Sequence, residues 1–370
     1  MTLSLEHVSK RVGRQTHMAD INLTLEPGSV NVLLGLTLAG KTTLMRLMAG
    51  LDKPTEGRVL SDGEDMARVP LRKRNVAMVY QQFINYPSLT VFENIASPLR
   101  IARVSRPEIR RRVHTEAERL GIDHLLDRLP AELSGGQQQR TAMARAMVRD
   151  AKLLLLDEPL VNLDYKLRED LRADLKQIFA QRDAIVVYAT TDPAEALAFA
   201  GNTAVLQEGR LMQFGPTMEV HDHPANEHVA AVFSDPPMNR VPGRISGGEV
   251  LIGSQLRMPV PPHLAGLGEG DFRFGLRPHH LRLGEQGNPY ILTAEVEVAE
   301  ITGSDTIVHL QSDGQPWIAV LEGVHGFRPG ESVHLHVPPE RLIAFDNDGD
   351  LLVAPPTSRS QRREVSHGAH

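Results

Sequence analysis

The segment that most restricts the fold of this chain is a glycine-bounded loop, GLTLAGKTT, at Gly35–Thr43. It follows the continuous apolar run Val30–Leu34, which is typical of a buried strand, and it precedes a helical pattern of apolar residues at 44–48. In a loop of the form GxxxxGK(S/T), glycines allow successive backbone N–H groups to face one anion, and the helix N-terminus adds partial positive charge. This order of strand, loop and helix predicts an α/β fold with a phosphate site rather than a chance glycine turn.

Further apolar runs in the N-terminal half predict the rest of this α/β core. Val76–Tyr80, Leu153–Leu156 and Ile185–Ala189 have the length and composition of buried strands, and Ile21–Leu25 alternates as a half-buried strand does. Helical patterns separate these runs along the chain. We therefore expect crossover helices and a largely parallel sheet, with a helical subdomain at about 84–150.

Within that subdomain, the segment SRPEIRRRVHTEAERLGI predicts one amphipathic helix. Its apolar residues fall on one face, Pro107 stands near its start and Gly121 at its end. Glu108, Glu116 and Glu118 interleave with the arginines, so we interpret the arginines as a solvated face.

After about Pro236 the sequence changes to short alternating strands separated by glycine and proline. We predict one domain at 1–235, a small all-β barrel of the OB-like kind at 236–355, and a disordered tail at 356–370. Such barrels can bind oligonucleotides, but residues 240–355 hold more acidic residues than arginines and no lysine. Together with a net charge of −6, this excludes nucleic acid as an expected partner.

The composition also indicates the cellular compartment in which the chain is expected to work. With 41% hydrophobic and 23% charged residues it has the character of a soluble globular protein. Its aliphatic runs are far shorter than the roughly 20 residues that cross a bilayer. The start, MTLSLEHVSK, lacks the features of a secretory signal, and the absence of cysteine agrees with a reducing compartment. We expect the chain to stay in the cytosol.

Two further motifs suit nucleotide chemistry. Asp157 and Glu158 follow the apolar run of leucines, where an aspartate can hold the Mg²⁺ shell through water and a glutamate can accept a proton from an attacking water. Alone, this acidic pair is a weak signal. The segment LSGGQQQR at Leu133–Arg140 offers backbone and hydroxyl donors to a phosphate, and its presence beside the glycine loop is very specific.

Together these motifs resemble the ATPase subunits of ABC transporters, and the match covers nearly the whole chain. The resemblance implies a P-loop NTPase fold, with an ABC ATPase domain, a helical subdomain and a C-terminal regulatory domain. In that family two ATPase domains meet head to tail, and each ATP lies between the phosphate loop of one and the LSGGQ segment of the other. The C-terminal barrel, with GLRPHH and RLIAFDNDG, is similar to the regulatory domain of carbohydrate-importer ATPases of the sugar and polyol uptake type.

The resemblance also assigns roles to residues. Gln81 matches the Q-loop glutamine, which touches Mg²⁺ and water, Glu158 is the catalytic base, and Asp164 ends the D-loop. Metal contacts fall to Thr42, Gln81 and, through water, Asp157. The implied ATP-binding residues are Val12, Gly35, Leu36, Thr37, Leu38, Ala39, Gly40, Lys41, Thr42 and Thr43. The residues expected to contact the ATP of a partner are Ser134, Gly135, Gly136 and Gln137.

Two positions depart from the family pattern. Thr191 stands where the family places a histidine that contacts the γ-phosphate. Directly after it, Asp192, Pro193 and Glu195 predict a capping-box-like helix start, and Gly201 predicts the end of that helix. Thr191 is therefore expected at the strand-to-helix edge. A threonine carries no positive charge, and losing one such donor typically costs on the order of 10²–10³ in rate. Val12 replaces the aromatic residue that stacks on adenine, and we interpret His17 as a solvated loop residue rather than a substitute.

An impaired own site beside an intact LSGGQ segment suggests pairing with a second, non-identical ATPase. The implied setting is an importer with ATP and Mg²⁺, two transmembrane permease subunits and a solute-binding protein, and with this chain peripheral on the cytoplasmic face of the membrane. Glycerol, glycerol phosphate and sugars are all admissible solutes. Two alternatives stay open: a nucleotide-binding regulatory subunit that does not hydrolyse ATP, and a soluble ABC ATPase outside transport.

Overall fold

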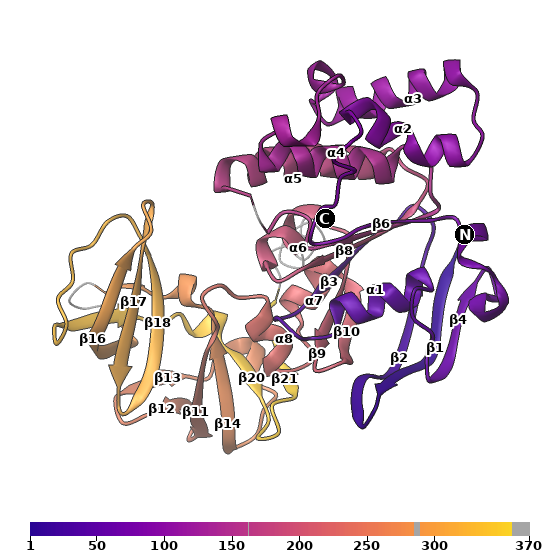
Figure 1. The fold of residues 1–370 in the computed structure, drawn as a ribbon. Helices are drawn as coiled ribbons and strands as arrows, with labels where there is room; N and C mark the ends of the chain where they lie inside the picture. The colour runs from indigo at the N-terminus through magenta and orange to yellow at the C-terminus, as the bar shows by residue number, and fades with distance from the viewer. Residues whose placement is uncertain (162, 285–288, 357–370) are drawn as a thin grey trace, which may run out of the picture. The chain divides into compact units, whose positions relative to one another are not determined.

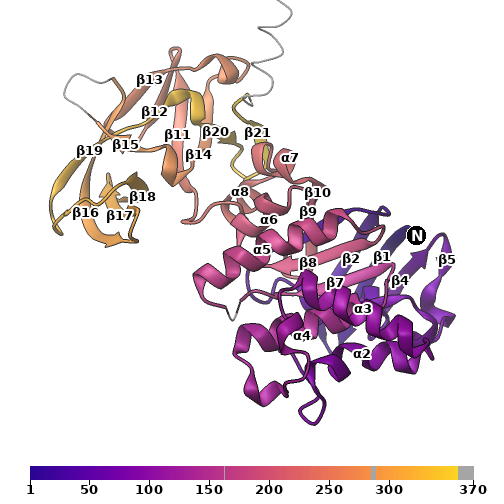
Figure 2. The same cartoon turned by 90° about the horizontal axis from the view of Figure 1, so that it is seen from above.

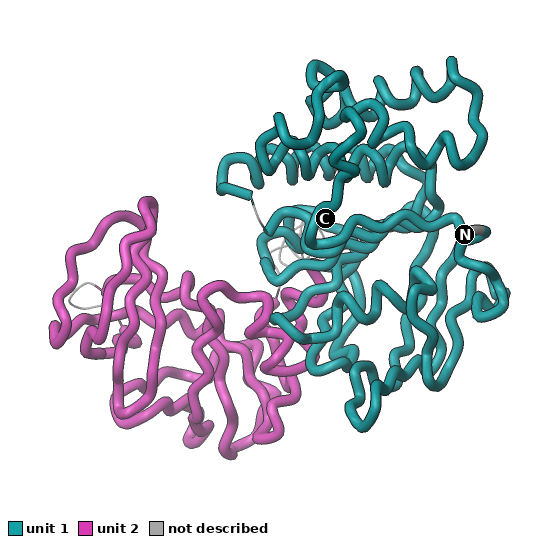
Figure 3. The backbone as a smooth tube through the Cα atoms, in the orientation of Figure 1, with its two compact units in different colours: residues 1–217 teal, residues 218–370 magenta. Residues whose placement is uncertain are grey.

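The computed structural model describes residues 1–161, 163–284 and 289–356. It divides into two compact units, residues 1–217 and 218–370 (Figure 3). The division falls before Pro236, where the sequence predicts a boundary. Apart from Pro356, the predicted disordered tail lies outside the described residues.

Unit 1 is built on a six-stranded, mostly parallel sheet with the strand order β10-β9-β3-β8-β7-β6 (Figure 1). Strand β3 pairs in parallel with β8 and β9, and β7 pairs in parallel with β6 and β8, whereas β10 runs antiparallel at the edge. The predicted α/β core is confirmed. The strands of this sheet are β3 (Val30–Leu34), β6 (Val76–Val79), β7 (Leu153–Asp157), β8 (Ile185–Thr190), β9 (Asn202–Gln207) and β10 (Arg210–Pro216).

A second, antiparallel sheet of unit 1 has the order β2-β1-β4-β5, and it contains the alternating run Ile21–Leu25. The sequence analysis predicted one largely parallel sheet and did not predict this second one. Alternation indicates that a strand is half-buried, but it does not indicate which strands pair with it. Leu44 and Met48 share one core cluster with both sheets, so helix α1 (Lys41–Ala49) packs between them. The strands of the second sheet are β1 (Leu3–Val12), β2 (Gln15–Leu25), β4 (Glu56–Ser61) and β5 (Glu64–Asp65).

Three helices, α2 (Val91–Ile101), α3 (Arg106–Arg119) and α4 (Gly135–Met147), pack on one another as the helical subdomain (Figure 2). The apolar face of α3 is buried as predicted. Glu116, which interleaves with the arginines of α3, is buried, and its side chain pairs with Arg182 at 2.9 Å. A buried carboxylate needs such a partner, and the partner lies outside the local sequence.

The remaining helices are α5 (Tyr165–Ala180), α6 (Pro193–Phe199), α7 (Thr217–Asp222) and α8 (Glu227–Val232). Gly201 does not cap α6, since Ala200 takes the left-handed conformation there. A Cβ on Gly201 would lie 2.1 Å from the carbonyl oxygen of Val30, so this glycine serves close backbone packing. Among the described residues, no helix is long and apolar enough to span a membrane.

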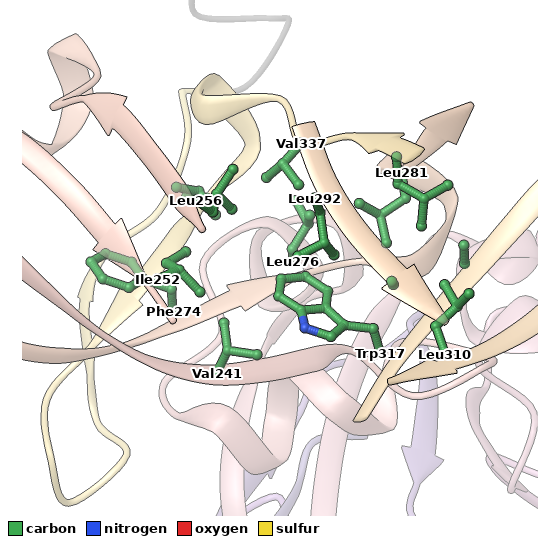
Figure 4. Packing of buried hydrophobic residues seen from close by; sticks show 14 of the residues in the cluster. Val241, Ile252, Leu256, Phe274, Leu276, Leu281, Leu292, Leu310, Trp317 and Val337 are labelled. Carbon is green, nitrogen blue, oxygen red and sulfur yellow. The ribbon is translucent and has the colours of Figure 1, made fainter. Parts of the chain in front are cut away.

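Unit 2 begins with α7 and α8, and from Asn239 on it is the predicted all-β, OB-like domain. Two antiparallel sheets form this domain, with the orders β13-β12-β11-β14-β20-β21 and β15-β19-β16-β17-β18. Inward residues such as Phe274, Leu310 and Trp317 form its core (Figure 4). The strands are β11 (Asn239–Ser246), β12 (Glu249–Ile252), β13 (Leu256–Pro259), β14 (Gly270–Leu276), β15 (Arg282–Leu283), β16 (Ile291–Ile301), β17 (Asp305–Ser312), β18 (Gln315–Glu322), β19 (Ser332–His336), β20 (Ile343–Phe345) and β21 (Leu351–Val353).

Candidate functional site

A cleft of about 670 Å³ opens beside the loop that joins β3 to α1. It lies at the carboxyl edge of the parallel strands, where ligands bind in open α/β sheets. Seven of the predicted loop residues line it, together with side chains from the β2, β6, β7 and β9 ends. The lining residues are Gln15, Thr16, His17, Thr37, Leu38, Ala39, Gly40, Lys41, Thr42, Thr43, Gln81, Glu158, Glu208 and Gly209.

The backbone of the loop explains its two glycines. A Cβ on Gly35 would lie 2.5 Å from the carbonyl oxygen of Leu206, so only glycine fits against the neighbouring strand. Gly40 precedes α1 with φ of 104°, a conformation that glycine adopts without strain, and no side chain caps the helix there. The first N–H groups of α1 therefore stay available to an anion. Leu38 also has a positive φ, of 69°, and its side chain is 93% exposed.

Lys41 is the centre of a polar network at the floor of the cleft. Its side chain is buried, and its Nζ donates to the carbonyl oxygens of Gly35 at 2.7 Å and Leu36 at 3.2 Å. The same Nζ lies 3.1 Å from Glu158 Oε1. Gln81 Nε2 donates to Glu158 Oε2 at 3.0 Å. The structure thus brings together three side chains that are far apart in the sequence.

Two acidic residues at the end of β7 have different surroundings. Asp157 is buried, and burial raises the pKa of its carboxyl group. A hydrogen bond with Thr42 opposes this shift by lowering the same pKa. Glu158 is partly exposed and has a positive φ of 44°, while its N–H donates to the carbonyl oxygen of Ala189 at 3.0 Å. A non-glycine residue in that conformation is strained, and such strain clusters at functional sites. Thr42 and Asp157 form an oxygen donor set of the kind that suits Mg²⁺.

The LSGGQ segment forms the start of α4. Ser134 is the N-cap, whose Oγ accepts from Gln137 N at 3.4 Å, while Gln137 Oε1 accepts from Ser134 N at 3.0 Å. This is a capping box. Ser134 and Gly135 are exposed, and a Cβ on Gly135 would meet nothing within 4 Å. Gly136 is different, because a Cβ there would lie 2.2 Å from a methyl group of Leu167.

Two other predicted positions lie outside the described lining of the cleft. Asp164 caps α5 by accepting from Leu167 N at 2.9 Å. Thr191 is exposed between β8 and α6. The capping box predicted beside it does not form: Asp192 alone caps α6, while Glu195 is buried and accepts from the Tyr188 hydroxyl at 3.0 Å. Burial raises the pKa of Glu195. Its buried carboxyl group needs a hydrogen-bond partner, and the Tyr188 hydroxyl supplies one in place of the backbone N–H at the helix start.

At the other end of the cleft, the structure departs from the placement of Val12. Val12 is 54% exposed at the end of β1 and is not among the described lining residues, whereas His17 lines the cleft. Sequence reasoning missed Gln15, Thr16, Glu208 and Gly209. The only signal for the last two was a Glu-Gly turn between apolar runs, which predicts a hairpin and not a site. Gly209 ties the turn to the loop by donating to the carbonyl oxygen of Ala39 at 3.0 Å.

Two family models match this chain. The model described as ABC transporter matches residues 18–161, and the model described as TOBE domain matches residues 274–345. The first match contains the loop, Gln81 and the acidic pair, and the second falls within unit 2. The two matches thus agree with the division of the chain into two units.

Several named relatives match over almost the full length. The uncharacterized ABC transporter ATP-binding protein y4oS of Sinorhizobium fredii is 38% identical over 90% of this chain and 90% of its own length. The trehalose/maltose import ATP-binding protein MalK of Thermococcus litoralis is 36% identical over 92% of this chain and 96% of its own. The sn-glycerol-3-phosphate import ATP-binding protein UgpC 1 of Rhizobium johnstonii is 35% identical over 99% and 98%.

Solved structures match the N-terminal part. A dimeric ATP-binding cassette in a post-hydrolysis state, bound to ADP and Pi, superposes with a TM-score of 0.53 at 29% identity, covering 58% of this chain and 98% of its own. The structure of cbiO1 from Clostridium perfringens, part of the ABC transporter complex cbiONQ, superposes with a TM-score of 0.54 at 28% identity, covering 59% of this chain and 89% of its own.

Proposed function

This chain belongs to the family of ABC transporter ATP-binding proteins, and on that premise we propose that it couples Mg-ATP binding and hydrolysis to the uptake of a small polyol or sugar. Import is the activity named for relatives that match along nearly all of this chain. The solute class follows from the same relatives, one named for trehalose and maltose and another for sn-glycerol 3-phosphate.

The observation that carries this proposal is the network of Lys41, Glu158 and Gln81 at the edge of the sheet. Lys41 and the first N–H groups of α1 bind the phosphates, because both present positive charge to the same side of the loop. Glu158 accepts a proton from the attacking water, which Gln81 orients through the hydrogen bond that it shares with Glu158. Mg²⁺, when held by Thr42 and Asp157, supplies positive charge to the phosphate oxygens.

A groove beside this network suits a permease contact. It has a volume of about 340 Å³ and is lined by residues 76–80 of the β6 region, by Ile84 and Tyr86, and by Ile101 of α2. Ile84 is 66% exposed and Ile101 is 83% exposed. An exposed apolar patch on a rigid frame favours an apolar partner segment. Because the groove adjoins the Gln81 segment, a membrane subunit seated there would sense the state of the nucleotide site.

We further propose that Ser134 and Gly135 contact the nucleotide of a second ATPase. Both are exposed at the N-terminus of a 13-residue helix, where N–H groups favour an anion. The similar cassette of known structure is dimeric. The Ser134 Oγ accepts from Gln137 N, which leaves its hydroxyl hydrogen free to donate to a phosphate.

The partner in this proposal is a second, non-identical ATPase with a complete site. Thr191 is uncharged, exposed and outside the described lining of the cleft, so the site on this chain's own loop lacks a cationic donor there. A partner that has this donor would hydrolyse its ATP against the Ser134–Gly136 segment of this chain. A regulatory subunit that binds ATP without hydrolysis is the second candidate, and the same feature at Thr191 favours it.

Affinity purification of the tagged chain from membranes of its own host tests the assignment. We expect two permeases and a second ATPase to co-purify, with ATP hydrolysis that rises when solute and its binding protein are added. Mass spectrometry of the intact complex counts the copies. Two copies of this chain with no other ATPase would contradict the unlike pair, and a chain that never associates with a membrane subunit would contradict import.

Thr191→His tests the impaired site in the assembled complex. We expect turnover to rise by up to about tenfold, since an imidazole adds a donor to developing phosphate charge. Thr24→His is the matched control, because Thr24 is an exposed threonine on β2 of the same unit. If steady-state hydrolysis is equal in both variants, the missing histidine is not what limits this site.

Gly135→Ala tests the contact with the partner's nucleotide. We expect hydrolysis by the complex to fall on the order of 10²-fold, because the new methyl group keeps a phosphate from the helix N-terminus. The melting temperature of the chain alone should stay unchanged, since open space surrounds that position. Gly268→Ala, another glycine whose Cβ would meet nothing within 4 Å, is the control. Full hydrolysis by Gly135→Ala would contradict the contact.

A further inference from the structure

Unit 2 contains a short basic segment that the nucleotide chemistry does not use. Arg277, His279 and His280 follow the end of β14, and the last two lie in a short 3₁₀ turn. The residues on either side, Leu276 and Leu281, are buried in the core of unit 2 (Figure 4). The two leucines anchor the backbone of the segment at both ends.

These side chains line a cavity of about 190 Å³ within unit 2. Polar residues from three separate stretches of the chain meet there, which are His221, Asp222, Arg277, His279, His280 and Arg341. A second cavity of about 320 Å³ shares His280 and Arg341. Among the described residues, no group of three or more His, Asp and Glu side chains is arranged to hold a metal ion.

The charge in this cavity is mainly positive. Arg277 is 5% exposed, and its guanidinium donates to the carbonyl oxygens of Phe233 at 3.1 Å and His221 at 2.7 Å. Burial lowers the pKa of Arg277 to about 10, so the group stays charged at neutral pH. Among the described residues that line the cavity, Asp222 supplies the one carboxylate, and it is bonded to His221 Nδ1 at 2.8 Å. Arg277 and Arg341 therefore outnumber the negative charge.

His280 adds a polar atom with no partner. Its Nδ1 is buried, and no described group forms a hydrogen bond with it. Burial, aided by the positive charge of nearby groups, lowers the pKa of His280 to about 3, so the ring is neutral at physiological pH. A neutral imidazole can carry its hydrogen on Nδ1 and donate it. A buried polar atom without a partner costs free energy unless a ligand or water satisfies it.

We propose that this cavity binds a small ligand through a phosphate group, with Arg277, Arg341 and His280 as its donors. Guanidinium groups match the geometry and charge of phosphate oxygens, and a buried arginine is already held in place by its two carbonyl contacts. The volume suits inorganic phosphate or a small phosphate monoester and excludes a whole nucleotide. The site is separate from the nucleotide cleft of unit 1 and extends the proposed function by a second ligand.

The test is calorimetric titration of the full chain with inorganic phosphate and, separately, with glycerol phosphate. Because the loop in unit 1 also binds phosphate, the titration uses the Lys41→Ala background, so that binding in unit 2 is measured alone. We expect saturable binding that Arg341→Gln weakens roughly tenfold or more, as expected for a lost hydrogen bond to a charged group. Arg257→Gln, an exposed arginine of β13 that lines neither cavity, is the control and should leave affinity unchanged.

Arg277→Lys in the same titration tests the buried arginine, and circular dichroism checks that this variant folds. Tighter binding of glycerol phosphate than of inorganic phosphate would identify a metabolite as the ligand, and the reverse order would identify free phosphate. The proposal is overturned if phosphate binding disappears with Lys41→Ala, or if Arg341→Gln and Arg257→Gln bind alike. Neither result depends on ATP hydrolysis, so failure here leaves the proposed function standing.

Discussion

The nucleotide cleft of unit 1 and the basic cavity of unit 2 treat charge in opposite ways. In the cleft, Lys41 is already paired with Glu158, and Glu208 adds a second carboxylate to the lining, so both signs of charge are present before any ligand arrives. In the cavity, Arg277 and Arg341 face the neutral His280, and the one described carboxylate belongs to Asp222. This difference in charge indicates which kind of ligand each site can bind. A site with charges of both signs suits a metal-nucleotide complex, which also carries both, whereas a mainly positive site suits a bare anion.

The largest effect is expected from Glu158→Gln, which removes the carboxylate paired with Lys41. Hydrolysis of the ATP held on this chain's own loop should fall on the order of 10²–10⁴-fold, the range for loss of a general base, while ATP binding is kept. Glu208→Gln is the matched control, since Glu208 lines the same cleft. Single-turnover hydrolysis and filter binding of ATP measure the two quantities. Equal losses in both variants would show that the cleft responds to charge in general and not to this base.

A smaller effect is expected from Asp157→Asn, which separates metal binding from folding. Burial raises the pKa of Asp157, so its charged form is disfavoured in the folded state, and the neutral asparagine should raise the melting temperature of the ligand-free chain. Mg²⁺ dependence of ATP binding should weaken about 10- to 100-fold. Asp127→Asn, at an exposed aspartate, is the control. Unchanged Mg²⁺ affinity would remove Asp157 from the metal site.

The smallest effect is the part of the pH dependence of stability that arises in the cavity. The pKa of His280 is lowered from 6.5 to about 3 in the folded chain, so between these values the unfolded chain binds one more proton there. Stability should therefore fall as the pH drops from neutral toward 4. The charged or titratable groups that line the two cavities with His280 are His221, Asp222, Arg277, His279, Arg282, His336, Glu340 and Arg341.

His280→Phe removes this titrating group, and urea unfolding of unit 2 followed through Trp317 fluorescence across that pH range measures the result. We expect a shallower slope of unfolding free energy against pH than in the parent chain. His325→Phe is a control at another histidine of unit 2, which does not line this cavity, and it should keep the parent slope. Equal slopes in parent and His280→Phe would place the acid sensitivity elsewhere.

Local patterns predicted most of the fold because they report on burial. Continuous apolar runs marked β3, β7 and β8, and their order along the chain indicated parallel pairing. The same patterns misjudged polar residues. Glu195 was predicted as part of a helix cap, and the charged residues around Glu116 gave no sign of its burial, yet Glu195 is buried against Tyr188 and Glu116 against Arg182. Sequence spacing contains no information on such partners, because they come from other elements.

By itself, the sequence determined which strands are buried, where the phosphate loop lies and that a β domain follows, since each depends on residues within one short stretch. Only the tertiary structure decided that Lys41, Gln81 and Glu158 meet, that His17 and not Val12 lines the cleft, and that Arg277 and His280 face a cavity. The physical reason is that a functional site is formed by side chains from segments that are distant in the sequence. Their distances are set by how sheets and loops pack, which no single stretch encodes.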